Sequence, residues 1–296
     1  MSAPLLMLVA SFLFAGMGVA VKVASAHYAA GEIVFYRSLI GALMVVGGTR
    51  WHRASLATRL PAMHFWRSLS GVAALMLWFY AIAGLPLATA MTLNYMSSVW
   101  MALFLIGGAV MLGSKAVDGR LVATVLAGFA GVALVLRPTI EENQLWHGLI
   151  GLFSGMLAAM AYLQVTALGR AGEPEVRIVF YFSIGGMVAG AASMLVTGAS
   201  PHSAIGVALL LAVGVLATVA QLMMTRAYSI GRALVNASLQ YVGIAWSALF
   251  GLLLFGDRIG ALAWLGIALI VAAGLAATLL RSRTAPRDAD HSLIES

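Results

Sequence analysis

The sequence predicts an all-α membrane protein with ten transmembrane helices, arranged as two inverted five-helix repeats (5+5). Two observations lead to this prediction: the composition is too apolar for a water-soluble domain, and two stretches about 145 residues apart resemble each other. Of the 296 residues, 62% are hydrophobic and only 9% are charged. Soluble domains carry roughly 25% charged residues. A lipid bilayer removes the need for a charged surface.

The formal net charge of +7 does not indicate a nucleic-acid partner, because the basic residues are scattered singly and form no basic run or helix face. The chain has no cysteine, which excludes disulfides, thiol catalysis and thiolate metal sites. Nothing basic precedes Lys22, and the first apolar stretch is long for a signal peptide. We therefore expect this stretch to be retained as the first membrane helix.

The hydrophobic pattern defines each predicted span. A membrane helix needs about 20 mostly apolar residues to cross the hydrocarbon region. Ten stretches approach or exceed this length, and the fifth is the shortest. They are 4–25, 31–48, 64–85, 87–112, 121–136, 147–168, 178–198, 204–225, 233–255 and 260–280.

Basic residues in the loops predict the orientation, because cytoplasmic loops are enriched in Lys and Arg. With a cytoplasmic N-terminus, the outside loops hold only Arg137 and Arg258. Lys22, Arg37 and Arg67 fall within spans and are not counted. The inside loops and tail then hold Arg50, Arg53, Arg59, Lys115, Arg120, Arg170, Arg177, Arg226, Arg232, Arg281, Arg283 and Arg287. This bias places both termini in the cytoplasm.

The internal repeat divides the chain into two halves. Residues 33–38 (IVFYRS) match 178–183 (IVFYFS), and residues 92–95 (TLNY) match 238–241 (SLQY). The predicted units are therefore a first repeat at 1–140, a second at 141–280 and a short basic tail at 281–296. Because five spans is an odd number, the second repeat enters the membrane from the opposite side. Inverted repeats are typical of transporters with a substrate site near the midplane.

Polar residues within spans are candidates for substrate binding, because they are costly in the membrane. Thr92 and Tyr95 share a predicted helix face, as do their counterparts Ser238 and Tyr241. The complete set of predicted substrate-binding residues also includes Asn94, Gln240, Gln164, Trp78, Tyr80, Met17, Lys22 and Gln221. The tyrosines could instead bond only across helices, Lys22 could pair with Glu32 or point to headgroups, and Arg37 could be structural. These walls predict a pocket with almost no fixed charge, which suits neutral or zwitterionic metabolites.

Other function classes find little support in the sequence. The motifs HExxH, GxSxG and the P-loop are absent, as are paired intramembrane aspartates, so an integral membrane enzyme is not expected. No histidine pair has metal-ligand spacing on one helix, so neither a metal nor another cofactor is predicted. A channel remains an alternative; counterflow-stimulated flux would distinguish a carrier from it.

Several local patterns carry a resemblance to a known family. These are GVAVK at 18–22, FYRSLIGA at 35–42, and GDR at 256–258 followed by GIALI at 266–270. The chain resembles the EamA-like branch of the drug/metabolite transporter superfamily over residues 4–280. It departs from the family at the closing acidic position, which is Asp257 instead of the frequent Glu, and at 113–116 (GSKA), which lacks an acid.

Within that branch the sequence is most like the YddG-type bacterial exporters of aromatic and other amino acids. The resemblance implies a multi-pass transporter in the bacterial inner membrane that exports aromatic and other apolar amino acids by alternating access. Another metabolite or a drug-like compound is the alternative cargo. The expected partners are the lipid bilayer and the small-molecule substrate, and the expected assembly is a monomer or weak homodimer.

Overall fold

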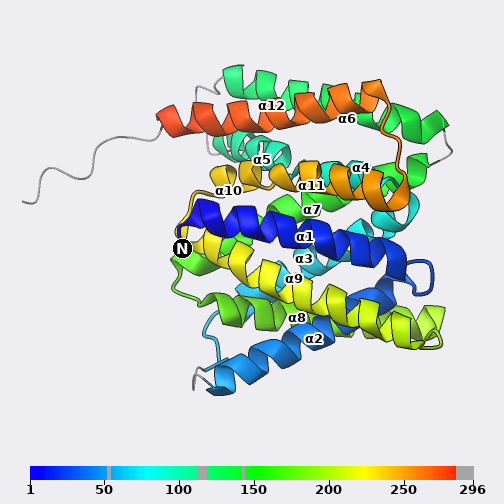
Figure 1. Cartoon of the computed structure of the whole chain (residues 1–296). Helices are drawn as coiled ribbons and strands as arrows, with labels where there is room; N and C mark the ends of the chain where they lie inside the picture. Colours follow the sequence, from blue (N-terminus) through cyan, green and yellow to red (C-terminus); the bar gives the residue numbers. More distant parts are fainter. Residues whose placement is uncertain (52–54, 112–118, 142–143, 285–296) are drawn as a thin grey trace, which may run out of the picture.

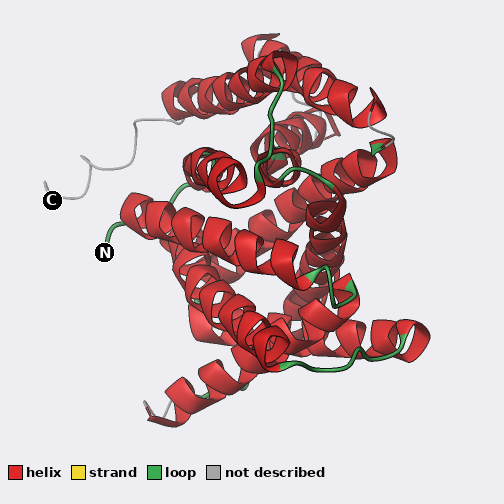
Figure 2. Cartoon of the chain, turned by 45° about the vertical axis from the view of Figure 1, so that its right-hand side comes forward, coloured by secondary structure: helices red, strands yellow, loops and turns green. Residues whose placement is uncertain are grey.

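The structure is a computed structural model that describes residues 1–51, 55–111, 119–141 and 144–284. Within these ranges the chain forms only helices and connecting loops (Figure 2). The elements are α1 (Ala3–Ala24), α2 (Ala30–Trp51), α3 (Pro61–Gly84), α4 (Leu87–Tyr95), α5 (Ser97–Met111), α6 (Gly119–Glu141), α7 (Leu145–Arg170), α8 (Glu175–Thr197), α9 (Ala204–Ile230), α10 (Ala233–Leu239), α11 (Val242–Phe250), the π-helix η1 (Gly251–Phe255) and α12 (Ala261–Thr284).

Eight helical segments of the described ranges are long and apolar enough to cross a membrane. Two of them are interrupted, and they combine α4 with most of α5 and most of α10 with α11 and η1. The helices α6 and α12 contribute shorter apolar stretches, Val122–Leu134 and Ala261–Ala276. The helix α12 continues to Thr284, four residues into the predicted tail 281–296, and residues 285–296 lie outside the described ranges.

The helices run roughly parallel to one another, and the closest pairs join the first part of the chain to the second (Figure 1). The helix α1 packs along α9, α3 along α7, α2 along α8 and α6 along α12. The last pair forms one edge of the molecule (Figure 1). Small residues allow close approach at these contacts. At Gly190 of α8, for example, an added methyl group would overlap the backbone of Gly31 and Phe35 in α2.

The predicted spans 87–112 and 233–255 coincide with the candidate spans Leu87–Gly108 and Val235–Phe255, but neither is one continuous helix. The first breaks at Met96. The helix α4 ends at Tyr95, the Met96 N–H donates a hydrogen bond to the Thr92 carbonyl, and α5 begins at Ser97. The second breaks at Gln240 and Tyr241, between α10 and α11. Both interruptions fall at the matched TLNY and SLQY stretches. Thr92 and Tyr95 therefore do not share a single straight helix with the residues that follow.

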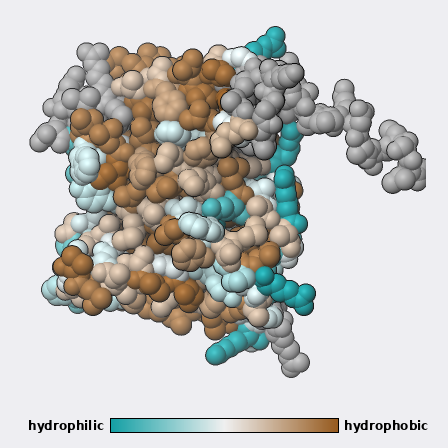
Figure 3. Space-filling model, turned by 180° about the vertical axis from the view of Figure 1, so that it is seen from behind, coloured by the Kyte–Doolittle hydropathy of each residue, from teal (hydrophilic) through white to brown (hydrophobic). Residues whose placement is uncertain are grey.

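The exterior of the molecule is apolar over most of its surface. Figure 3 shows hydrophobic residues across the visible face, with hydrophilic residues gathered mainly towards its edges. Large apolar side chains such as Leu195, Val196 and Leu253 are exposed by 89%, 87% and 68%. A soluble monomer rarely exposes such extensive apolar surface. Lipid is the environment that this surface suits.

Candidate functional site

A cavity at the centre of the molecule lies between α1, α2, α3, α4, α7, α8 and α9. It leaves about 50 Å³ for the centres of water molecules, which is room for only a few waters. Elements from both the first and the second half of the chain contribute to its wall. The lining residues are Phe14, Arg37, Arg67, Gly71, Ala74, Leu75, Trp78, Asn94, Tyr95, Ala158, Ala161, Tyr162, Phe182, Gln221 and Met224.

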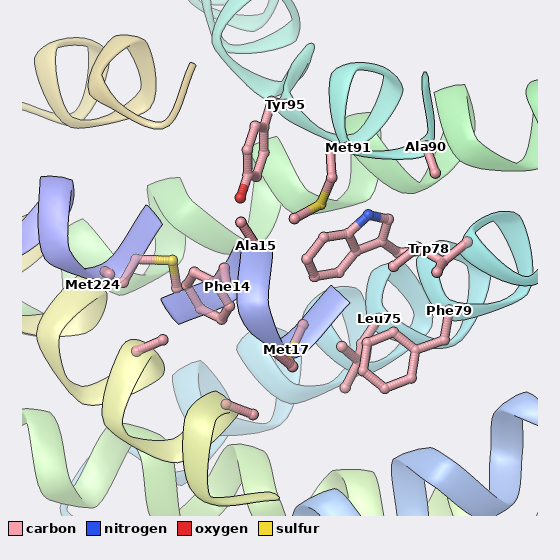
Figure 4. Close-up of a cluster of buried hydrophobic side chains, with 14 of the residues drawn as sticks. Phe14, Ala15, Met17, Leu75, Trp78, Phe79, Ala90, Met91, Tyr95 and Met224 are labelled. Carbon is pink, nitrogen blue, oxygen red and sulfur yellow. The ribbon is translucent and has the colours of Figure 1, made fainter. Parts of the chain in front are cut away.

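One side of this cavity is aromatic and apolar. Figure 4 shows Phe14, Trp78, Tyr95 and Met224 gathered from α1, α3, α4 and α9. The Trp78 ring lies 6.4 Å from the Phe14 ring and 6.4 Å from the Tyr95 ring, measured between centroids. Such a wall can hold an apolar or aromatic portion of a ligand. The Tyr95 hydroxyl and Trp78 Nε1 are buried without a hydrogen-bond partner.

The other side of the cavity carries two buried arginines. Arg37 on α2 and Arg67 on α3 are exposed by only 4% and 2%. Arg37 donates a hydrogen bond of 3.3 Å to the Gln221 side chain. The guanidinium carbons of Arg37 and Arg67 lie 5.1 and 4.4 Å from the centre of the Phe182 ring. This arrangement corrects the expectation of a pocket with almost no fixed charge.

Four of the residues predicted from the sequence to bind substrate line this cavity: Trp78, Asn94, Tyr95 and Gln221. Asn94 lies beside the cavity while its amide donates a hydrogen bond of 3.0 Å to Ser154 on α7. The structure therefore brings together α3, α4 and α9 side chains that are distant in sequence.

Five predicted residues lie in the helix packing around the cavity and not in its wall. The hydroxyl of Thr92 bonds to the Ala88 carbonyl in its own helix, and Gln164 accepts a hydrogen bond from Ser70. Met17 is fully buried in the apolar core. Ser238 donates to the Gly274 carbonyl, and Gln240 contacts the Met224 sulfur at 3.6 Å.

Tyr241 also lies outside the cavity, at the contact between the two broken helices. Its hydroxyl hydrogen-bonds to Ser98 of α5. In a corresponding way, the Tyr95 ring packs closely against Gly243 of α11, where an added methyl group would overlap the ring. Each of the two matched tyrosines therefore reaches across to the other broken helix. In this structure the Tyr241 hydroxyl is thus engaged in a contact between helices.

The remaining two predicted residues, Lys22 and Tyr80, lie towards the end of the molecule that carries the α3–α4 loop. Lys22 does not pair with Glu32; its ammonium donates to the Leu85 carbonyl at 2.8 Å and lies 3.5 Å from the Asp257 carboxylate. The same carboxylate accepts the Leu87 backbone N–H at 2.9 Å. Tyr80 is 39% exposed and stacks on the His147 ring. Lys22 and Asp257, with Leu85, Pro86 and Gln144, border a separate polar hollow.

At the opposite end of the molecule, Glu173 joins three elements. We call this end the basic end, because it includes Arg170, Arg177 and Arg226. Its carboxylate accepts hydrogen bonds from Thr58 at 2.9 Å and Arg177 at 3.0 Å, and lies 3.1 Å from His64 Nε2. Burial acts to raise the pKa of Glu173, but the hydrogen bonds from His64, Thr58 and Arg177 outweigh burial and lower that pKa. These contacts of Glu173 connect the α2–α3 loop and α3 to α8.

Sequence reasoning assigned no site role to Arg67, Tyr162, Phe14 or Phe182. A signal for the arginine was available, because a charged residue within an apolar span is a functional candidate by default. The aromatic residues gave no such signal, since apolar spans contain them for packing as well. Only the fold shows that all four line one cavity.

Comparison with known proteins identifies a family of membrane transporters. The EamA-like transporter family matches residues 1–137. The pseudopaline exporter CntI of Pseudomonas aeruginosa is 34% identical over 278 residues, which cover 93% of this chain and 95% of the exporter. A riboflavin transporter of Rhizobium johnstonii is 28% identical over 227 residues, which cover 75% of this chain and 72% of that protein.

An uncharacterized transporter of Helicobacter pylori is 26% identical over 280 residues, which cover 91% of this chain and 92% of that one. A solved crystal structure superposes with a TM-score of 0.67 at 17% identity, covering 96% of this chain and 98% of the other. The chain is thus a multi-pass membrane transporter and not an enzyme. It belongs to the EamA-like transporter family, which confirms the resemblance to that branch. The narrower likeness to YddG-type amino-acid exporters stays a prediction.

Proposed function

We propose that this chain is a secondary transporter that moves small metabolites with an aromatic or apolar portion across the bacterial inner membrane by alternating access. Aromatic and other apolar amino acids are the first compounds to test, as the YddG-type resemblance suggests. The observation that carries the proposal is the central cavity, whose wall comes from both halves of the chain and includes Phe14, Trp78 and Tyr95. The pseudopaline exporter is among the relatives, which supports transport out of the cell.

The helix pairing supports a ten-span arrangement of two inverted repeats. If α1–α6 corresponds to α7–α12, then α1 corresponds to α7 and α3 to α9. The pair α1 and α9 is then equivalent to the pair α7 and α3, while α2 with α8 and α6 with α12 each pair an element with its own counterpart. The two broken helices also correspond. Interrupted helices near the midplane are a common device of transporters built from inverted repeats.

Two similar halves can exchange conformations, and this exchange would open the cavity to one side of the membrane and then the other. Contacts that join the halves at one end have to open when that end opens. The Lys22–Asp257 pair is such a contact, because it links α1 to the η1–α12 loop. The Glu173 cluster is another, since Glu173 lies between α7 and α8 and contacts Thr58 and His64.

The cargo is tested with purified protein in liposomes. We expect uptake of labelled phenylalanine, methionine or threonine, stimulated by unlabelled compound on the opposite side. Tyr95→Ala should reduce this uptake because it removes part of the cavity wall. Tyr241→Ala should reduce it because it removes the hydrogen bond to Ser98 between the two broken helices. The control is Trp51→Ala, since Trp51 is 85% exposed at the end of α2. If the folded protein transports no amino acid, the proposed substrate is wrong, while the fold assignment is unaffected.

The orientation is tested with single cysteines, which the cysteine-free sequence makes straightforward. Ala171 lies exposed in the α7–α8 loop and Ala199 lies exposed in the α8–α9 loop. With both termini cytoplasmic, a membrane-impermeant maleimide should label Ala199→Cys in cells with an opened outer membrane. Ala171→Cys should react only after the inner membrane is permeabilised. The reverse pattern would contradict the proposed orientation.

A further inference from the structure

The two arginines of the central cavity are charged groups within membrane-spanning helices. Arg37 is 4% exposed and Arg67 is 2% exposed. A buried guanidinium is costly unless a partner supplies both negative charge and hydrogen-bond acceptors. Helix packing alone does not account for two desolvated guanidinium groups in one place.

The contacts within the protein do not balance these two charges. Over the part of the chain that the structure describes, the ion pairs found involve other basic residues, and neither cavity arginine has an acidic partner. Arg37 has the single hydrogen bond to Gln221, at 3.3 Å. The Phe182 ring attracts both guanidinium groups, but it cannot accept their remaining N–H bonds in the way that an oxyanion can. Because both guanidinium groups lie at the same ring, their like charges also repel each other.

The unpartnered buried atoms of the cavity share one chemical character. They are Nε of Arg37, Nε and Nη1 of Arg67, Nε1 of Trp78, Nε2 of Gln221 and the hydroxyl of Tyr95. The nitrogen atoms in this set are all donors, and the hydroxyl can also donate. A ligand that satisfies them has to bring acceptors. A carboxylate does so, and it matches the forked guanidinium geometry.

Gly71 on α3 provides the space for this arrangement. It follows Arg67 by one helical turn, and a methyl group at this position would overlap Arg67 Nη1. A small residue here is therefore required for the guanidinium to lie against its own helix beside Phe182.

We propose that the substrate is an organic anion with an aromatic or apolar portion, whose carboxylate binds Arg37 and Arg67 while the apolar portion lies against Phe14 and Trp78. This inference rests on the proposed function, because it takes the central cavity as the transport site. It narrows the range of substrates, because no aspartate or glutamate among the described residues lines the cavity. The α-ammonium of a zwitterionic amino acid would lie near two guanidinium groups without a counter-charge. Compounds with net negative charge are therefore preferred over amino acids of zero net charge.

The test uses three probes that share a benzyl group and differ in charge: N-acetyl-L-phenylalanine, L-phenylalanine and L-phenylalaninamide. Binding is measured by isothermal titration calorimetry in nanodiscs, and transport by counterflow in proteoliposomes. We expect affinity to fall from the anion through the zwitterion to the cation, with the anion bound at least about ten-fold more tightly than the zwitterion. Arg37→Gln and Arg67→Gln should each reduce this anion preference by about ten-fold or more. Arg67→Lys should retain part of it.

Two further variants separate anion binding from a structural role. Gly71→Ala displaces the Arg67 guanidinium without removing its charge, so it should also lower the anion preference. Arg226→Gln removes a half-exposed arginine paired with Glu175 at the basic end and should leave the preference unchanged.

The outcomes distinguish this inference from the proposed function. Equal or tighter binding of phenylalanine, or arginine variants that change all three affinities equally, would overturn the anion preference while transport itself stands. A folded protein that neither binds nor transports any of the three probes would overturn both.

Discussion

At the basic end, the Glu173 carboxylate accepts hydrogen bonds from Thr58 and Arg177 and lies beside His64, whereas the central Arg37 and Arg67 meet no carboxylate within the described ranges. The end with the α3–α4 loop resembles the basic end, because Lys22 there meets Asp257. Charges that hold helices together are paired in this fold. Charges that face the cavity are not.

This difference separates structural from functional charge. Removing one member of a buried ion pair leaves the other without a partner, which is strongly destabilising. Removing an unpaired buried charge eliminates a desolvation cost, so it should leave stability unchanged or raise it. Substitutions at the ends should therefore lower stability, while substitutions at the centre should impair substrate binding.

The largest expected loss of stability is at Glu173. Glu173→Gln removes the charge that pairs with Arg177 and accepts a hydrogen bond from His64, and we expect the free energy of unfolding to fall by about 3 kcal/mol. The matched control is Glu175→Gln, whose partner Arg226 is 53% exposed, and which should cost about 1 kcal/mol or less. Both are measured by denaturant unfolding in micelles. Equal losses in the two variants would contradict a structural role for the buried cluster.

A smaller loss of stability is expected at the Lys22–Asp257 pair, because the two side chains are partly exposed, Lys22 by 18% and Asp257 by 12%. Lys22→Met and Asp257→Asn should each lower the free energy of unfolding by about 1–2 kcal/mol. The double variant should lose less than the sum of the two, with a coupling of about 1 kcal/mol. Additive losses in this double-mutant cycle would show that the pair does not hold the two segments together.

The pH dependence of stability should reflect Glu173, whose pKa is lowered in the folded protein. A carboxyl group with a lowered folded pKa contributes stability that is fully present above its unfolded pKa, about 4.3. This contribution is lost as the pH falls through the folded pKa. Unfolding measured between pH 7 and pH 3 should therefore show wild type losing its advantage over Glu173→Gln below about pH 4.3. A constant difference over this range would exclude the contribution.

The smallest effect on stability is expected at the cavity. Arg67→Gln should change the free energy of unfolding by less than about 1 kcal/mol, or raise it, because the variant removes an uncompensated charge. Thermal unfolding of the ligand-free protein measures this. A loss comparable to that of Glu173→Gln would mean that Arg67 is structural.

The sequence predicts much of the helical layout, because membrane spans need long apolar stretches and leave them visible. It does not predict the breaks at Met96 and at Gln240–Tyr241. No proline marks either break, and Gly243 is the single glycine beside the second one. Contacts such as that of Tyr241 with Ser98, which form only in the fold, stabilise the breaks. Part of the site follows from polar residues within spans, such as Asn94. The convergence of Arg67 and Phe182 on one cavity depends on packing between α3 and α8, and local patterns do not encode it.

The most direct test of the central cavity as the transport site uses one cysteine in its wall. Ala158 lines the cavity from α7, and the natural chain offers no competing thiol. In oriented proteoliposomes, Ala158→Cys should react with an impermeant thiol reagent added to either side, and a transported compound should slow both reactions. Reaction from one side only, or reaction that the compound does not affect, would contradict alternating access through this cavity.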